Sequence, residues 1–381
     1  MAYLESKPRY EILDGLRGVA AILVASFHIF ELYATSSADK IINHGYLAVD
    51  FFFLLSGYVT GYAYDDRLAS GKLTVRDFFK RRITSLLPML VMGITIGTLL
   101  FYFSVSPTAS IPPLWQVLLI AFAALFLVTL APCFAIKSGF EPYPLNGPVW
   151  SLACEYIGNI LYALVVRHFS KTMLAVFVGL CAFLTIDLGM NIDLFGLLKK
   201  CNYEAYSLNG GWLYIPSHLY IAMVRLFCSF FMGLLLARLG KKISLRGGLI
   251  WCALLLVMFI AAPRIGSGEF SWANGLYETL VVLVAFPLIV VAGAGSHVRA
   301  ARSLALCKWL GAISYPLYLI HDPLVYVLAS WKRSHPDAPL AVHIFMIIST
   351  FVLAVAVAYA SLKLYDQPVR KWLRHHWLAK N

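Results

Sequence analysis

Two ionisable side chains, Arg17 and His28, lie inside a stretch that is otherwise apolar enough to enter a membrane. They are eleven positions apart. On an α-helix of 3.6 residues per turn, that spacing returns to within about 20° of one direction and covers about 16 Å. A snorkelling arginine and a histidine with one interhelical hydrogen bond would be a purely structural explanation. An ionisable residue inside a membrane helix is by default a functional hypothesis, so we expect one polar face along this helix.

Two carboxylates, Asp50 and Glu155, also fall inside apolar runs, "GYLAVDFFFLLSGYVTGY" (45–62) and "NGPVWSLACEYIGNILYALVV" (146–166). Glu155 would lie about 10 Å, and His28 about 9 Å, from the outer ends of their helices. A carboxylate beside a histidine fixes its tautomer and stabilises its cation, which is what a general base requires. We expect Glu155 or Asp50 to orient His28, although Asp50 could equally pair with a group in a loop.

A basic cluster, "FFKRR" (78–82), contains Lys80, Arg81 and Arg82. Basic residues beside a membrane helix usually report its cytoplasmic end. Guanidinium groups also hold phosphate oxygens in bidentate geometry, so the same cluster could bind a phosphate. Both interpretations place it at the cytoplasmic side, together with Arg17.

The last polar stripe lies in "GAISYPLYLIHDPL" (311–324), where Ser314, Tyr318 and His321 follow helical spacing between Pro316 and Pro323. Proline kinks in membrane helices often border cavities. His321 is here either a structural hydrogen-bonding residue or a substrate contact.

The elements that must position these residues are membrane-spanning helices. Of the 381 residues, 60% are hydrophobic and 13% are charged, against about 25% charged in soluble proteins. The apolar residues form blocks long enough to cross about 30 Å of hydrocarbon. They do not alternate with polar residues as in a β-barrel. The net charge of +12 comes from clusters between blocks, so it indicates topology rather than nucleic-acid binding. The seven cysteines are scattered without a C-x-x-C pair, and we expect neither a metal site nor disulfides.

Eleven apolar blocks can be counted along the chain. They lie at 14–34, 46–64, 84–104, 114–136, 148–166, 171–189, 216–239, 247–263, 276–294, 308–331 and 340–364. The positions of the basic loops require an even number of crossings between 82 and 167, where three blocks lie, so one block does not cross. We assign that role to 114–136, as a re-entrant or interfacial segment. The prediction is an all-α, polytopic membrane protein with ten spanning helices.

A single transmembrane domain is expected over 1–381, with cytoplasmic tails at 1–12 and 366–381. The longest outer loop, "NIDLFGLLKKCNYEAYSLNGGWLYIPS", has aromatic and amide side chains suited to a polar ligand, or to an interfacial aromatic belt.

Five motifs, taken together and in order, resemble the acyltransferase-3 family of integral membrane proteins. They are "LDGLRGVAAILVASFH", "GYLAVDFFFLLSGY", "PVWSLACEY", "GAISYPLYLIHDPL" and "YDQPVRKWL". The family's arginine–ten residues–histidine signature falls on Arg17 and His28. Its Trp-Ser-Leu-x-x-Glu element falls on Trp150, Ser151 and Glu155. Where the family usually has a second basic residue, three positions after Arg82, this chain has Ser85.

This resemblance implies transfer of an acyl group, commonly acetyl, from a coenzyme A thioester to a carbohydrate hydroxyl. Acceptors would be surface polysaccharides, lipid-linked glycans or glycosides, and the setting the bacterial inner membrane. A stand-alone form without an appended esterase-like domain is expected. Arg17, Arg81 and Arg82 would bind the phosphates of acyl-CoA, and no metal would be needed.

In the same scheme His28 would act as general base, oriented by Glu155 or Asp50. Direct transfer and a transient acyl-histidine both remain open. The substrate contacts would be Trp150, Ser151, Tyr318 and His321.

Two other classes of function fit parts of the pattern. Intramembrane histidine, arginine and carboxylates also suit a transporter or flippase of a glycan or organic anion, although no inverted repeat is visible. A membrane-embedded glycan sensor would need a signalling domain, and none is recognised in the chain. Release of free CoA thiol from acetyl-CoA would distinguish an enzyme from both alternatives.

Overall fold

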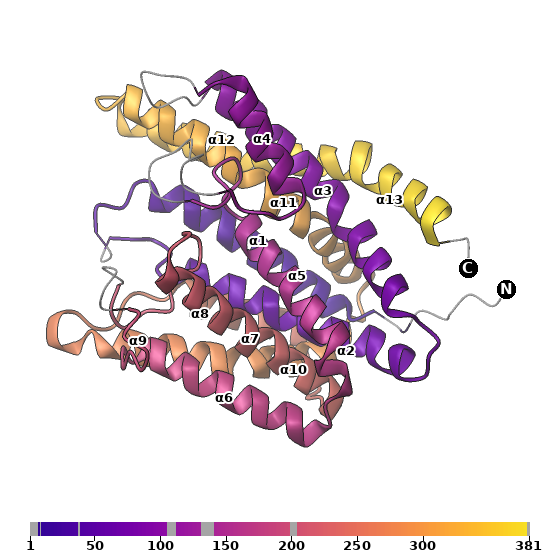
Figure 1. Cartoon of the computed structure of the whole chain (residues 1–381). Helices are drawn as coiled ribbons and strands as arrows, with labels where there is room; N and C mark the ends of the chain where they lie inside the picture. Colours follow the sequence, from indigo (N-terminus) through magenta and orange to yellow (C-terminus); the bar gives the residue numbers. More distant parts are fainter. Residues whose placement is uncertain are drawn as a thin grey trace.

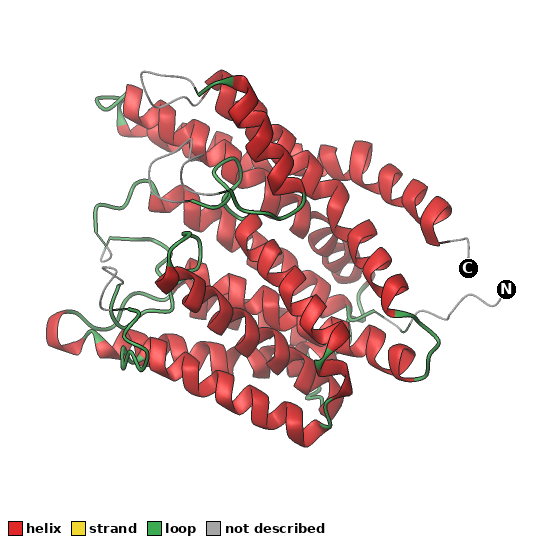
Figure 2. Cartoon of the chain, viewed as in Figure 1, coloured by secondary structure: helices red, strands yellow, loops and turns green. Residues whose placement is uncertain are grey.

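The computed structural model describes residues 7, 9–36, 39–104, 112–130, 141–198 and 204–378, and this part of the chain is all-helical, without a strand (Figure 2). In hydrocarbon a helix satisfies every backbone polar group within its own segment, which is why the apolar blocks become helices. The α-helices are α1 Glu11–Glu31, α2 Ala48–Ala69, α3 Val75–Ser104, α4 Leu114–Leu125, α5 Val149–Leu164, α6 Lys171–Gly189, α7 Pro216–Leu239, α8 Gly248–Ala261, α9 Trp272–Leu280, α10 Phe286–Gly295, α11 Ala301–Ser334, α12 Leu340–Ser361 and α13 Gln367–Leu373.

Eight helical segments in the described chain are long and apolar enough to cross a membrane. Three α-helices outside these eight segments are shorter: α4 has 12 residues, α8 has 14 and α5 has 16. At 1.5 Å per residue these cover about 18, 21 and 24 Å, less than the roughly 30 Å of hydrocarbon. The count of ten spans and the cytoplasmic position of both termini therefore remain predictions.

Two predicted segments take a more specific form in the structure. Block 114–136 is represented by α4 and the residues that follow it to 130, while 131–136 lie outside the described residues. The predicted C-terminal tail, 366–381, is helical as far as Leu378 and continues the last helix through α13. The helical residues of this tail pack against α3, whose first turns carry the basic cluster.

Helix α1 lies at the centre of the arrangement, where it packs on α11 most extensively and also on α2, α8, α10 and α12. Figure 1 shows the long helices running between two ends of the molecule, with the α2–α3 turn and α13 at the same end. Close approach depends on glycine: a Cβ on Gly18 would be 2.5 Å from the backbone oxygen of Leu310. The α2–α7 contact is similar, since a Cβ on Gly57 would be 1.8 Å from the oxygen of Phe230.

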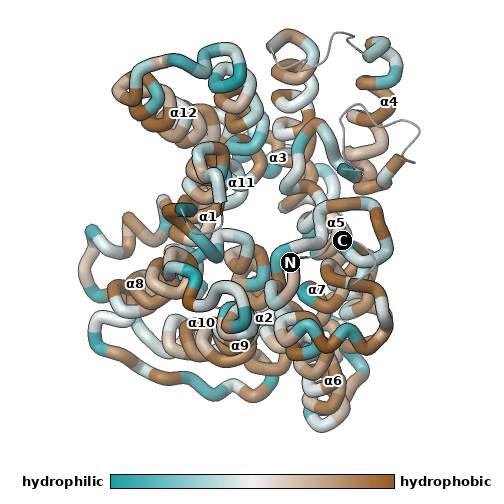
Figure 3. Tube along the Cα trace, turned by 90° about the vertical axis from the view of Figure 1, so that its left-hand side faces the viewer, coloured by the Kyte–Doolittle hydropathy of each residue, from teal (hydrophilic) through white to brown (hydrophobic). Residues whose placement is uncertain are grey.

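The outer faces of the helices are apolar. Figure 3 shows hydrophobic colouring along the helices and hydrophilic colouring mainly in the loops. Large side chains such as Phe183 on α6, Trp251 on α8 and Phe345 on α12 are exposed. A soluble monomer rarely exposes apolar surface on this scale, whereas lipid accommodates it. The chain is a multi-pass integral membrane protein.

Candidate functional site

The predicted polar face of α1 meets the predicted polar stripe of α11. Arg17 donates from Nε to Ser314 Oγ (3.0 Å) and from Nη2 to the oxygen of Gly311 (3.0 Å). Asp14, one turn earlier on α1, is 3.6 Å from Nη2 of Arg17. Although Ser314 is buried, the Arg17 side chain keeps 44% of its surface exposed. Arg17 is therefore fixed to α11 and still accessible to a ligand.

We call this line of contacts between α1 and α11 the α1–α11 seam. At its other end His28 contacts His321. Nδ1 of His28 and Nε2 of His321 are 3.0 Å apart, and the two rings lie at 21° to each other. His321 is fully buried, whereas His28 is half-buried. The shared face predicted for Arg17 and His28 is thus matched residue by residue, with Ser314 opposite one and His321 opposite the other.

The part of α11 around Pro323 is tied to the segment that precedes α5. Because Pro323 lacks an N–H, the carbonyl of Leu319 loses its helical donor. Asn146 Nδ2 donates to that carbonyl instead (2.7 Å). One residue later, the N–H of Gly147 donates to Asp322 Oδ2 (2.8 Å). The sequence "NGP" therefore anchors the start of α5 against α11.

This anchoring brings together two of the predicted substrate contacts. Ser151, on the first turn of α5, lies 2.6 Å from the hydroxyl of Tyr318, oxygen to oxygen. The Tyr318 ring lies 6.0 Å from the ring of His321, centroid to centroid, and 5.4 Å from that of Phe52. Two polar pairs, Ser151 with Tyr318 and His321 with His28, are therefore brought side by side by the ring contact of Tyr318 with His321.

Glu155 does not approach His28 through any contact in the structure. It accepts hydrogen bonds from Ser56 Oγ (2.5 Å) and from Arg82 Nη2, with which it forms an ion pair. The predicted orientation of His28 by Glu155 is therefore replaced by His321. The prediction was wrong because it rested on estimated depths in the membrane, whereas Glu155, in the second turn of α5, contacts Arg82, in the third turn of α3.

Asp50 is likewise committed elsewhere. Its carboxylate is buried and accepts hydrogen bonds from Arg225 Nε (3.1 and 3.2 Å) and Nη2 (2.7 Å). Arg225 also donates to the oxygens of Gly210 and Tyr46, each at 2.6 Å. Within the part of the chain that the structure describes, Asp50 therefore pairs neither with His28 nor with a group in a loop, the two alternatives that the sequence left open. Its partner is an arginine in α7. Asp50 thus fixes Arg225, whose guanidinium lies 5.7 Å from the ring centre of Trp150.

Trp150 lies beneath the loop that the sequence predicts to be outside the membrane. One described part of that loop, 204–211, is held to the core at Gly210 by Arg225 and at Leu208, whose N–H donates to Glu278 (2.6 Å). Gly211 then passes over the Trp150 ring with φ of +112°, and a Cβ there would be 2.8 Å from the ring. Only glycine combines this backbone conformation with this close approach. The loop that the sequence suggested for ligand contact covers a predicted substrate residue.

The basic cluster is divided among different partners. Lys80 lies 3.8 Å from Asp77, and Arg82 contacts Glu155. Arg81 forms no ion pair among the described residues, and its Nε is buried without a hydrogen-bond partner there. Arg17 makes its polar contacts to α11 and Asp14, so no direct contact joins it to Arg81 or Arg82. Nε of Arg82 is likewise buried without a hydrogen-bond partner, so Arg81 differs from Arg82 in forming no ion pair among the described residues.

Sequence reasoning missed four polar residues that build this region: Arg225, Ser56, Asn146 and Asp322. Arg225 carried a signal, because it is a lone arginine inside the apolar block 216–239. Asn146 could have been found from Pro323, which predicts an unpaired carbonyl in α11. Ser56 was assigned to helix packing because of its small size. No group of His, Cys, Asp or Glu among the described residues is arranged to hold a metal ion.

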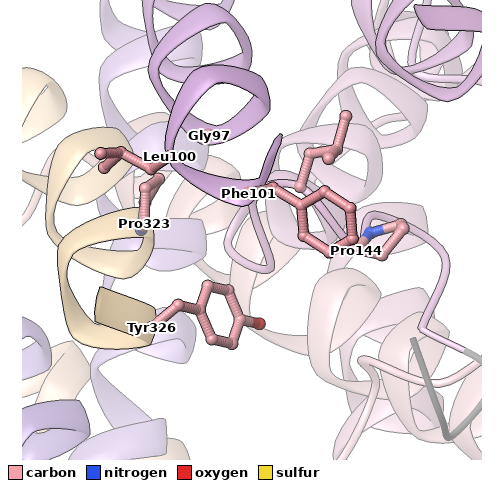
Figure 4. A pocket seen from close by; sticks show the side chains of 7 residues that line it. Gly97, Leu100, Phe101, Pro144, Pro323 and Tyr326 are labelled. Atoms are coloured by element: carbon pink, nitrogen blue, oxygen red, sulfur yellow. The ribbon is translucent and has the colours of Figure 1, made fainter. Parts of the chain in front are cut away.

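One apolar pocket lies next to the site, about one turn of α11 beyond His321 (Figure 4). It is small, with room for no more than about one water molecule. Tyr326 and Pro323 of α11 face Phe101 of α3 and Pro144 across it. Nearby, the Tyr143 hydroxyl donates to the oxygen of Leu127 (2.7 Å), and burial raises the pKa of Tyr143. Its lining carries no charged group, and it is too small to hold a sugar or an acyl chain.

Comparison with known proteins gives a family and distant relatives. A family model described as "Acyltransferase domain" matches residues 10–361. "Protein 2 in picA locus" of Rhizobium radiobacter is 33% identical over 162 residues, which are 41% of this chain and 81% of that protein. The O-acetyltransferase OatA of Staphylococcus aureus is 24% identical over 391 residues, covering 96% of this chain. The chain spans 58% of the length of OatA. No solved structure matches.

Proposed function

The chain belongs to the acyltransferase family whose model it matches from residue 10 to 361, and we propose that it is an O-acetyltransferase with a carbohydrate acceptor. The donor is acyl-CoA, taken from the cytoplasmic side, and the acceptor is a hydroxyl of a surface polysaccharide, a lipid-linked glycan or a glycoside. The similarity to OatA supports the acetyl group. The protein acts in the bacterial inner membrane.

The donor binds at the Arg17 end of the α1–α11 seam. Arg81 and Arg82 hold phosphate oxygens there, and Arg17 contributes the third guanidinium. Two observations support this assignment: the Arg17 side chain keeps 44% of its surface exposed, and Arg81 forms no ion pair among the described residues. Arg82 has to exchange its contact with Glu155 for a phosphate, or share it, since both ligands accept from the same guanidinium.

The reaction takes place at the His28 end, about 16 Å along α1 from Arg17. His28 takes the proton of the acceptor hydroxyl while the hydroxyl oxygen attacks the thioester carbon. The C–O bond forms and the C–S bond breaks. The proton then passes from His28 to the leaving thiolate, which gives the O-acyl acceptor and free CoA thiol. Trp150, Ser151 and Tyr318 contact the acceptor in this scheme, and this assignment is supported by the position of Tyr318, which is hydrogen-bonded to Ser151 and next to the ring of His321.

The observation that carries this proposal is the paired seam itself. The basic residue and the histidine of one helix are each hydrogen-bonded to the same neighbouring helix, at its Ser314 and His321. A seam built only for packing would need neither an exposed guanidinium nor a half-buried imidazole. The arrangement gives an anion-binding end and a proton-accepting end on one face.

The test is transfer of acetyl by the purified protein in lipid nanodiscs, followed as free CoA thiol released with a glycan extract as acceptor. We expect His28→Ala to lower turnover by about 10²–10⁴-fold, the usual contribution of a general base. Wild-type turnover in a folded His28→Ala protein would remove His28 from the mechanism. Absence of thiol release by the wild-type protein with any extract would favour the transport alternative.

The donor site has its own test. Arg81→Gln is expected to raise the apparent KM for acetyl-CoA by about tenfold or more, because a lost charge-assisted contact is worth roughly 1.5–3 kcal/mol. Arg302→Gln, an exposed arginine at the start of α11, is the matched control and should leave that KM unchanged. An unchanged KM in Arg81→Gln would overturn the phosphate role. Mass spectrometry of glycans from cells with and without the protein would identify the acceptor.

A further inference from the structure

His321 lies between two hydrogen-bonding partners that together define its protonation. Its Nδ1 is 3.0 Å from the oxygen of Leu317, one turn earlier on α11. A carbonyl oxygen only accepts, so Nδ1 of His321 carries a proton and donates it to Leu317. A neutral imidazole has one N–H, and Nε2 of His321 is therefore left with a lone pair.

That lone pair faces Nδ1 of His28 at 3.0 Å. Two ring nitrogens at this distance share one proton, and here only His28 can supply it. His28 is consequently protonated on Nδ1 and has its own lone pair on Nε2. We propose that His321 is a positioning residue that holds His28 in this tautomer, so that Nε2 of His28 is the atom that takes the acceptor's proton. The proposal rests on the proposed role of His28 as general base.

The neutral form of His321 follows from its surroundings. The ring is fully buried, and a buried cation without a counter-ion is strongly disfavoured. The adjacent carboxylate, Asp322, accepts from the N–H of Gly147 and forms no ion pair or hydrogen bond with the His321 ring among the described residues. If His321 were doubly protonated, its Nε2–H would donate to Nδ1 of His28. His28 would then carry its own proton on Nε2 and could not accept one there.

The same contact supports the charged intermediate. When Nε2 of His28 takes a proton, the ring becomes an imidazolium whose Nδ1–H still donates to Nε2 of His321. The lone pair of His321 then stabilises the positive charge, as a carboxylate does in a serine-protease triad. The proton goes no further, because the next partner of His321 is the carbonyl of Leu317. His321 therefore positions and stabilises His28 without relaying protons.

The first test reads the tautomer directly. ¹⁵N-histidine-labelled protein in nanodiscs is examined by NMR, where protonated and unprotonated ring nitrogens have well-separated ¹⁵N shifts. The His28 signals are assigned as those that disappear in His28→Gln. We expect Nδ1 of His28 to be protonated and Nε2 to be unprotonated at neutral pH. A His28 ring protonated on Nε2 instead would overturn the proposal.

The second test separates positioning from fold. His321→Leu removes the acceptor for His28 and is expected to lower kcat by about 10²–10⁴-fold, the cost of a wrong tautomer in the triad enzymes, without a comparable change in the KM for acetyl-CoA. His321→Gln offers an amide oxygen to Nδ1 of His28 and should recover at least about tenfold of that loss. His335→Leu, at the exposed end of the same helix, is the control and should retain wild-type turnover.

The outcomes separate this inference from the proposed function. A kcat of His321→Leu within about threefold of wild type would refute the positioning role, whatever His28→Ala does. Full activity in His28→Ala, together with a His28 protonated on Nδ1, would refute the general base while leaving the tautomer assignment correct. If His321→Leu does not fold, the spectrum of the wild-type protein decides.

Discussion

The buried pair of Asp50 and Arg225 gives a quantitative prediction about stability. Replacing Arg225 by Met keeps a side chain of similar length and removes all its hydrogen bonds. The carboxylate of Asp50 then remains buried without a cation, the oxygen of Gly210 loses the donor from Arg225, and the oxygen of Tyr46 keeps only the N–H of Ala48. The substitution therefore removes a hydrogen-bond donor from three buried acceptors at once.

The magnitude follows from what is left behind. Breaking a buried ion pair by removing one partner costs about 3–5 kcal/mol, and each buried acceptor without a donor costs roughly 1–3 kcal/mol. These contributions overlap, because the carbonyls can shift toward water or other donors. We expect Arg225→Met to lose about 4 kcal/mol, a large share of the 5–15 kcal/mol that stabilises a typical domain.

The assay is a double-mutant cycle with Asp50→Asn. Wild type, both single variants and the double variant are heated in the same detergent, and the fraction that stays monodisperse is measured by size-exclusion chromatography. Asp50→Asn removes the buried charge, so the double variant should be more heat-resistant than Arg225→Met alone. The reasoning is refuted if Arg225→Met unfolds at the wild-type temperature, or if adding Asp50→Asn to it gives no recovery.

Two further predictions concern close helix packing and the hydrogen bond from Asn146 to Leu319. Gly57→Val should lower the unfolding temperature sharply, because its Cβ would meet the oxygen of Phe230 at 1.8 Å and overpacking typically costs about 1–3 kcal/mol or more. The control is Gly179→Ala, which has open space around it and should unfold at or above the wild-type temperature. Asn146→Leu should cost about 1–3 kcal/mol, because the buried oxygen of Leu319 loses its donor; an unchanged unfolding temperature would show that another donor replaces it.

The helices were largely predictable from sequence because lipid leaves few options for an apolar block. The blocks at 171–189 and 216–239 coincide with α6 and α7 to the residue. Periodicity also placed Arg17 and His28 on one face, since rotation about a helix depends only on spacing. The polar stripe of α11 was predicted by the same argument, and the structure brings these two stripes together.

The side-chain partners were not predictable by the same means. Depth in the membrane was estimated from block boundaries that are uncertain by several residues, which was too coarse to pair Glu155 with Arg82 rather than with His28. Periodicity places a residue on a face of its own helix but does not say which helix packs there. The partners of Asp50 and His28 depended on α7 and α11, which are far away in sequence.

The hydrogen bond from Asn146 to the carbonyl of Leu319 also has a genetic consequence. The amide of Asn146 stands in for a main-chain N–H that Pro323 lacks. Changing Pro323 to Ala would return that N–H to α11, and the carbonyl of Leu319 would no longer depend on a distant side chain. Pro323→Ala should therefore act as a second-site suppressor of Asn146→Leu. A selection for revertants of Asn146→Leu would then recover substitutions at Pro323, although the two positions are far apart in the sequence.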